Sequence, residues 1–426
     1  MVIRFQRINT VERLILFIFA MPFAFFFLID VLGLPSLIKY SLDAVWVLLL
    51  LLLCGRRAIS ADSSTTTLLK IVGAFFTCTI VGFLLNYQSA VYYLWGLRNN
   101  LRFFVFFFAC ILFLRESLAE KCIRFMDTLF YLNIPVMLYQ YFVMGKSWDY
   151  LGGIFGVEVG CNGYVNIFFA IVITRTILAY MNKTEKPRSC FFKCGAALVL
   201  SALAELKVFF IEFILIIMLA SLLTRFSMRK MWIFIGAIVG IAVSLRIITN
   251  LFPQYANWFS FDEIWKSISS DAGYTSQNDM NRMTAITISS ERFLPTVLDK
   301  LFGLGLGNCD YASFDFLITP FYRAHNKLHY TWFSSAFTVL ETGFVGLTLY
   351  VSFFIAVCLQ VNKKLKNGTG DLLSGQMALI MSLLCLVLIV YNSSLRIESA
   401  YMVYFVLALP FIRKSGTVRE SVPKEC

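Results

Sequence analysis

The chain has 426 residues, of which 59% are hydrophobic and 15% are charged, and its mean hydropathy is +0.76. An average soluble domain is about 45–50% apolar and about 25% charged, so this composition excludes disordered, fibrous and disulfide-rich secreted proteins and argues against a soluble enzyme. Apolar runs of about 18 or more residues recur along most of the length, which predicts an all-α polytopic membrane protein. The net charge of +12 is attributed to the cytoplasmic bias of Lys and Arg in membrane proteins rather than to nucleic-acid binding.

The N-terminus is basic (Arg4, Arg7 and Arg13) and leads into a long apolar run. No small-residue cleavage site follows this run, so a retained first span is expected rather than a signal peptide. Hydropathy predicts about twelve spans within a single membrane domain covering residues 1–426. They lie near 14–34, 40–54, 66–87, 101–114, 125–144, 163–181, 194–206, 207–224, 231–251, 340–361, 375–392 and 398–412.

Basic residues cluster in every second connection, which orients the chain with both termini in the cytoplasm. The segments assigned to the cytoplasm are the N-terminus, Arg56–Arg57, Arg115–Arg124, Lys183–Lys193, Arg225–Lys230, Lys363–Lys366 and the tail from Arg413. Residues 191–224 have basic segments on both sides, so an even number of crossings is required there. A hairpin with its tip at Glu205–Lys207 is therefore predicted instead of one long helix.

One connection is far longer than the others and runs over residues 252–330, between the ninth and tenth spans. It is predicted to be extracytoplasmic, with apolar stretches at Ile286–Ile288 and Phe293–Leu298 that could form amphipathic helices on the membrane face. A loop of this length in a compact protein is usually functional or disordered, and its aromatic content favours order. No internal repeat is found, which weakens an interpretation as an inverted-repeat transporter.

Eleven cysteines are scattered through the chain, many of them inside apolar runs. They are interpreted as small buried apolar residues. Only Cys161 and Cys309 fall in segments placed outside, so a disulfide between them stays open without further support.

The two histidines, His325 and His329, are four residues apart at the end of the large loop, a spacing that shares one face of a helix. They are either ordinary surface residues or acid–base groups, because an imidazole with a pKa near 6.5 can accept a proton from a hydroxyl near neutral pH. No metal site and no cofactor are predicted, since two imidazoles need a further ligand to hold zinc.

Basic residues on the outer side oppose the general charge bias and need an explanation. Guanidinium groups bind phosphate oxygens bidentately, so an anionic ligand at the outer leaflet is predicted. The alternative is that these cations extend to the membrane surface or pair with Asp271, Asp279, Glu291 and Glu398, and for Lys207 that it pairs with Glu205 or Glu212 at the hairpin tip. The candidate cations are Arg98, Arg102, Lys207, Arg282, Arg292, Arg323 and Arg396.

Glycine-rich segments complete the pattern. Leu301–Asn308 (LFGLGLGN) is followed by Arg323–Asn326 (RAHN) and then by Leu340–Gly346 (LETGFVG), while Gly152–Gly156 (GGIFG) and Gly160–Gly163 (GCNG) lie upstream. Taken in this order, with the hairpin tip Ala204–Lys207, the segments resemble the superfamily of O-antigen polymerases and O-antigen ligases.

The resemblance implies a GT-C-type architecture and glycosyl transfer without a metal, at the outer face of a bacterial inner membrane. The substrate would be an oligosaccharide on undecaprenyl diphosphate, with membrane lipid, a flippase and a chain-length regulator as candidate partners and no nucleic acid. His325 or His329 would activate the acceptor hydroxyl. Arg98, Arg102, Arg282, Arg292, Arg323 and Lys207 would hold the diphosphate, and Glu205, Asn326, Glu341 and Arg396 are further candidates.

Polymerase is the first expectation, and it covers O-antigen, capsule and exopolysaccharide chains. The alternative is a ligase that transfers a finished glycan to an acceptor, which the residues alone barely separate from a polymerase. A lipid-linked oligosaccharide flippase is the more distant alternative, because it predicts two similar halves and no long outer loop.

Overall fold

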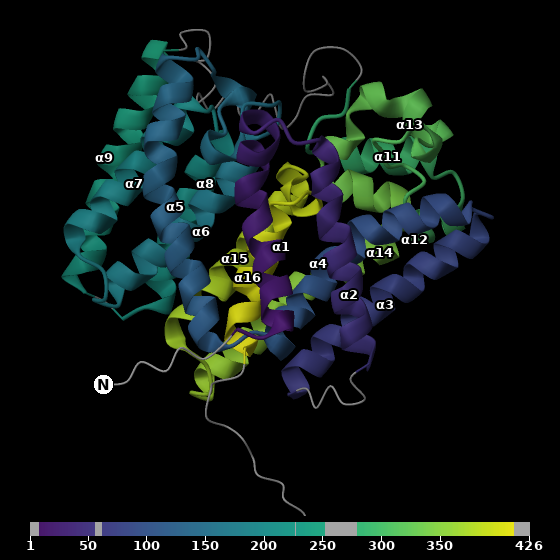
Figure 1. Ribbon diagram of the computed structural model, residues 1–426, viewed down its shortest axis with the longest axis horizontal. Helices are drawn as coiled ribbons and strands as arrows, with labels where there is room; N and C mark the ends of the chain where they lie inside the picture. The colour runs from purple at the N-terminus through teal and green to yellow at the C-terminus, as the bar shows by residue number, and fades with distance from the viewer. Residues whose placement is uncertain (1–7, 56–61, 226, 252–278, 413–426) are drawn as a thin grey trace, which may run out of the picture.

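The computed structural model describes residues 8–55, 62–225, 227–251 and 279–412, and every regular element among them is helical (Figure 1). The helices outside the large loop are α1 (Thr10–Phe26), α2 (Ser41–Gly55), α3 (Ser63–Leu85), α4 (Ala90–Phe113), α5 (Glu116–Phe142), α6 (Asn162–Met181), α7 (Pro187–Leu203), α8 (Lys207–Leu223), α9 (Met228–Leu251), α14 (Ser334–Lys366), α15 (Leu372–Tyr391) and the shorter α16 (Ala400–Ala408). Each of the twelve predicted spans overlaps one of these helices.

Eight of the described helical segments are long and apolar enough to cross a membrane. They are Thr10–Val31, Ser36–Gly55, Ser63–Leu85, Ala90–Phe113, Asn162–Met181, Met228–Ile247, Ser334–Lys366 and Leu372–Tyr391, and Ala400–Phe411 forms a shorter apolar helix. The chain is thus an α-helical membrane protein, as its composition predicts.

Local sequence accounts for several helix ends. Asn9 caps α1 by accepting from the Glu12 amide at 2.8 Å, while the Glu12 carboxylate accepts from the Asn9 amide, which satisfies two amides that have no partner inside the helix. Asp371 caps α15 by accepting from the Ser374 amide at 2.8 Å. Pro187 begins α7, where a missing N–H costs nothing.

The centre of the bundle is formed by α4, α6 and α16, and α6 is buried along nearly its whole length. Phe103 and Phe104 of α4 pack on Tyr404 of α16 with ring centroids 5.7 and 5.4 Å apart, and Tyr401 lies 5.0 Å from Phe103. Offset and edge-to-face aromatic pairs of this kind add to the area they bury. Several of the 44 phenylalanines therefore fill the core rather than facing lipid.

Two span predictions need correction. The fourth span was expected at 101–114 with Arg98 and Arg102 at its outer end, but α4 begins at Ala90 and both arginines lie inside the helix. The tenth span was expected at 340–361, whereas α14 begins at Ser334 and is interrupted at Gly343, whose φ is 65° and ψ is −171°. The hairpin prediction for 191–224 is confirmed, since α7 and α8 are separated only by Ala204–Leu206.

The large loop is ordered over the part that the structure describes, residues 279–330. It contains α11 (Ala285–Phe293), α12 (Val297–Phe302) and α13 (Pro320–His325), which lie together beside α14 (Figure 1). The predicted stretch Phe293–Leu298 is not one helix, because α11 ends at Phe293 and α12 begins at Val297. Residues 252–278, including Asp271, lie outside the described part.

Cys161 and Cys309 are buried free thiols and form no disulfide.

Candidate functional site

The glycine-rich segment 303–307 is fixed against the first turns of α14. The Leu304 amide donates to the Leu340 carbonyl at 2.8 Å, and the Gly305 amide donates to the Glu341 carbonyl at 3.1 Å. A Cβ placed on Gly303 would lie 2.5 Å from the Glu341 carbonyl carbon. Two motifs that are far apart in the sequence therefore contact each other through backbone atoms, which only glycine permits at this distance.

The opposite side of this loop is held by the ends of α3 and α4. The Asn86 side-chain amide donates to the Gly303 carbonyl at 3.0 Å, and the Gln88 side-chain amide donates to the Leu306 carbonyl at 2.8 Å. Trp95 donates to the Tyr311 carbonyl at 3.0 Å. These hydrogen bonds thus hold the loop between α3, α4 and α14.

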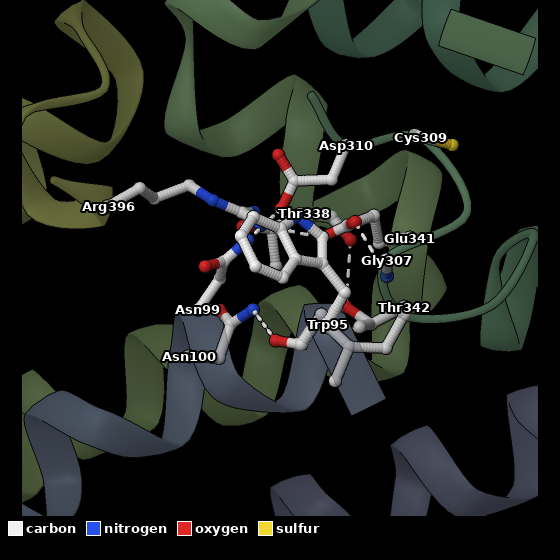
Figure 2. Close-up of polar contacts among 12 residues, drawn as sticks. Trp95, Asn99, Asn100, Gly307, Cys309, Asp310, Thr338, Glu341, Thr342 and Arg396 are labelled. Carbon is white, nitrogen blue, oxygen red and sulfur yellow. Dashed lines mark hydrogen bonds and ion pairs between the residues drawn. The ribbon is translucent and has the colours of Figure 1, made fainter. Parts of the chain in front are cut away.

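At the centre of this region Glu341 pairs with Arg396 at 2.6 Å, and their side chains are 0% and 9% exposed (Figure 2). The second carboxylate oxygen of Glu341 accepts from the Gly307 amide at 2.8 Å. The Arg396 guanidinium lies 3.5 Å from the centroid of the Phe337 ring, which adds a cation–π contact. Glu341 therefore connects α14, the glycine loop and the turn before α16.

A second set of charged and polar side chains lies next to the Glu341–Arg396 pair. Arg98 donates to both carboxylate oxygens of Asp43 at 2.9 and 2.7 Å, and to the Asn99 side chain at 2.6 Å. Asn99 in turn donates to Asp310 at 2.6 Å. Figure 2 shows Asp310 and Arg396 directed toward the same region as Glu341 and Asn99. Burial raises the pKa of Asp310, although the Arg396 guanidinium acts in the opposite direction.

The third pair joins α4 to the segment before α16. Arg102 is buried and pairs with Glu398 at 3.0 Å, while the Tyr164 hydroxyl donates to the other Glu398 oxygen at 2.8 Å. Arg102 also donates to the Arg396 carbonyl at 3.4 Å. Burial acts to raise the pKa of Glu398, but Arg102 and Tyr164 outweigh it and lower that pKa to about 2. The carboxylate therefore stays charged across the physiological range.

At the hairpin tip Lys207 pairs with Glu205 at 2.9 Å. Arg282 and Asp149 lie close enough to Lys207 for their charges to interact with it. Arg282 also donates a hydrogen bond to the Tyr391 carbonyl at 3.1 Å. Glu212 lies deeper in α8 and is fully buried, where it accepts from Asn166 at 3.1 and 3.2 Å.

The two histidines do not share a helix face, contrary to the spacing argument. The helix α13 ends at His325, and His329 has a left-handed backbone with φ of 55°. His325 packs against the rings of Phe293 and Phe321, with both centroids 4.8 Å away. His329 stacks on Trp332 at 3.9 Å. The intervening Asn326 is exposed, and its carbonyl accepts from the His329 amide.

Arg292 is exposed beside His325 and lies 5.4 Å from the Phe293 ring centroid, and within the described residues it makes no ion pair. Burial and the Arg292 charge both lower the pKa of His325. Arg323, near the same end of the molecule, pairs with Asp315 at 2.8 Å on the surface.

The predicted cations therefore lie in three groups rather than around one crevice. Arg98, Arg102 and Arg396 belong to a buried network, Lys207 and Arg282 lie near the hairpin tip, and Arg292 and Arg323 are on the loop helices. Two of the expected carboxylate pairs form, Arg102 with Glu398 and Lys207 with Glu205. Arg98, Arg323 and Arg396 also pair with carboxylates, but with Asp43, Asp315 and Glu341, which were not the expected partners. In the buried network four carboxylates surround three guanidinium groups, so it has no surplus of positive charge.

Sequence reasoning missed three polar partners in this network: Asp43, Asn99 and Asp310. A signal existed for Asp43, because an acid at the start of an apolar span is costly unless it has a partner. Asn99 and Asp310 carried no signal of their own, since both occur in polar stretches. Among the described residues, no three His, Cys, Asp or Glu side chains are grouped so that they could hold a metal ion.

The arrangement provides buried fixed charges at the end of the bundle that carries the loop helices. The loop helices at this end separately carry a partly exposed imidazole, His325, and a guanidinium, Arg292, that has no carboxylate partner in the part of the chain that the structure describes. The sequence matches no protein-family model, and no curated protein sequence matches it either.

Proposed function

We propose that this membrane protein is a glycosyltransferase that polymerises oligosaccharide repeat units carried on undecaprenyl diphosphate. The observation that supports this most directly is the contact between Leu301–Asn308 and Leu340–Gly346. These are two of the segments through which the sequence resembles the O-antigen polymerase and ligase superfamily, and they jointly hold the Glu341–Arg396 pair. Two of the resembling segments, which are separated in the sequence, thus meet at one polar centre.

In the proposed reaction an acceptor sugar hydroxyl attacks the anomeric carbon of the lipid-linked sugar, and the bond from that carbon to the diphosphate oxygen breaks. His325 accepts the hydroxyl proton, and the leaving diphosphate takes the electron pair of the broken bond. Arg292 is the first candidate to stabilise the diphosphate, because it lies beside His325 and has no carboxylate partner in the described chain. The buried network around Arg396 has a positioning role.

We also propose that the twelve predicted spans cross the bilayer in a GT-C-type arrangement, with both termini in the cytoplasm of a bacterial cell, and that the last crossing is the shorter apolar segment Ala400–Phe411. The helices α7 and α8 have 17 residues each, which is at the lower limit of about 17–25 residues for a span. The basic connections would then face the cytoplasm, and α11–α13 would lie outside.

Activity can be tested with purified full-length protein and lipid-diphosphate-linked repeat units extracted from the source strain. We expect a ladder of products that differ by one repeat unit. His325→Ala should lower the rate by about 10²–10⁴-fold, the usual contribution of a general base. Lys327→Ala, an exposed residue on the following turn, is the matched control, and His329→Ala tests the other imidazole. A single transfer to a separate acceptor would indicate a ligase, and full activity in both histidine variants would refute the base role.

The pH dependence gives a separate prediction. A base must be neutral to act, and the pKa of His325 is lowered, so kcat/KM should fall only below the usual histidine value of about 6.5. Arg292→Gln removes one cause of the lowering, so its acid limb should move to higher pH. Arg323→Gln, whose partner is Asp315, should leave the midpoint unchanged. An acid limb at the same pH in the wild type and in Arg292→Gln would contradict the assignment.

A further inference from the structure

A cavity of about 340 Å³ lies next to the buried network and is not used by the mechanism above. It is bordered by the end of α1, the 155–161 segment and the turn that carries Arg396. Its lining combines rings with charged groups, namely Phe26, Asp30, Lys39, Phe155, Glu158 and Tyr164. Ligand pockets typically range from about 300 to 1,000 Å³, so this cavity suits a small group.

The walls of the cavity are held in place by buried hydrogen bonds. The Gln140 side chain accepts from the Gly153 amide at 2.6 Å and donates to the Gly153 carbonyl at 2.8 Å, and Asn133 accepts from the Ile154 amide at 2.8 Å. Both side chains are almost completely buried. Phe155 is therefore fixed before any ligand arrives, which lowers the entropic cost of binding.

The α1 side of the cavity has an unusual backbone. Helix α1 continues as a π-helix over Phe27–Val31, and this turn carries Ile29 and Asp30 into the cavity lining. Short π-helical turns are rare and often occur at functional sites. Gly156 has φ of 118°, and a Cβ there would lie 3.3 Å from the Phe26 ring. Phe155 and Gly156 of the GGIFG segment thus form part of the cavity wall.

The cavity is also connected to the buried network. Tyr164 lines it and donates to Glu398, which pairs with Arg102, and Arg102 donates to the Arg396 carbonyl. Ser393 and Ile397, on either side of Arg396 in the sequence, line the cavity as well. A ligand here would therefore contact the turn that positions Arg396.

We propose that this cavity binds one pyranose ring of a glycan, which deepens and rests on the proposed function. Aromatic rings pack on the C–H faces of a pyranose, while the carboxylates of Asp30 and Glu158 accept from its hydroxyls and Lys39 donates to them. A lipid tail fits less well, because three charged side chains would lose solvation without gaining partners. Since Asp30, Glu158 and Lys39 are all exposed at the rim, their substitution leaves the core intact.

The test uses full-length protein in a detergent without a sugar headgroup, such as lauryldimethylamine oxide. Saturation-transfer NMR is recorded with the methyl glycosides of glucose, galactose, mannose and N-acetylglucosamine. We expect transfer to at least one probe and a decrease in its affinity by about tenfold or more in Asp30→Asn/Glu158→Gln, as for the loss of two charge-assisted hydrogen bonds. Glu120→Gln, in a separate cavity of about 580 Å³ lined by Arg124 and Lys364, is the matched control.

Absence of a saturation-transfer signal from all four methyl glycosides would overturn the proposal. An affinity that is the same in the wild type and in Asp30→Asn/Glu158→Gln would overturn it as well. Tyr164→Phe keeps the ring but removes the hydrogen bond to Glu398, so it should retain sugar binding while it lowers polymerisation. Specific sugar binding without glycosyl transfer would support the cavity and reject the proposed function. Glycosyl transfer by a protein that binds no sugar in this cavity would support the proposed function and reject the cavity as a sugar site.

Discussion

Arg396→Ala is expected to destabilise the protein by about 3–5 kcal/mol, the usual cost of removing one partner from a buried ion pair. The substitution leaves the Glu341 carboxylate uncompensated at 0% side-chain exposure. Because Arg396 no longer orients the Glu341 carboxylate, the hydrogen bond from the Gly307 amide to that carboxylate is weakened as well. Unfolding by sodium dodecyl sulfate in mixed micelles, followed by tryptophan fluorescence, measures the difference.

Arg323→Ala is the matched control, because its pair with Asp315 is 55% and 83% exposed and exposed pairs contribute about 0–1 kcal/mol. Adding Glu341→Gln to Arg396→Ala should recover part of the loss, since the remaining side chain is then neutral. If Arg396→Ala is as stable as Arg323→Ala, the pair does not organise this centre.

Gly343→Ala is expected to destabilise the protein about as much as Arg396→Ala, but through backbone strain and steric overlap. Its φ of 65° and ψ of −171° fall in a region that is essentially restricted to glycine, and a Cβ would lie 2.3 Å from the Leu301 carbonyl carbon. Backbone strain of about 1–3 kcal/mol and overpacking of about 1–3 kcal/mol both oppose the variant. We expect a large drop in the yield of monodisperse protein and an early unfolding midpoint.

Gly73→Ala is the control for this prediction. Gly73 lies in α3 with ordinary helical geometry, and a Cβ placed there would meet no atom of another element within 4 Å. Alanine is favoured over glycine in a helix by about 0.5–1 kcal/mol, so this variant should be as stable as the wild type or slightly more stable. Equal stability of the two alanine variants would show that α14 can straighten at residue 343.

The charge balance of the buried network constrains how an anionic substrate could approach it. Each of Arg98, Arg102 and Arg396 already has a carboxylate partner. A diphosphate could reach one of these guanidinium groups only by displacing its carboxylate partner. Arg292 requires no such exchange, which is why the proposed mechanism assigns the leaving group to it.

The sequence by itself determined the membrane class, the approximate position of twelve helices and the hairpin at Glu205–Lys207. These follow from hydropathy and from basic segments, which depend on the side chains of a local window. The same window failed for α4, because Arg98, Asn99, Asn100 and Arg102 lower the local hydropathy although they lie inside the helix. They are tolerated there because their partners come largely from other elements.

Only the tertiary structure decided which charges pair. Asp43, Glu341 and Glu398 come from distant parts of the chain, and no periodicity connects them to Arg98, Arg396 and Arg102. The histidines show the same limit, because the spacing of four residues implied a common face only while a helix continued, and α13 ends at His325. Pairing of buried charges and the termination of short helices depend on contacts between remote segments, which composition and local pattern do not encode.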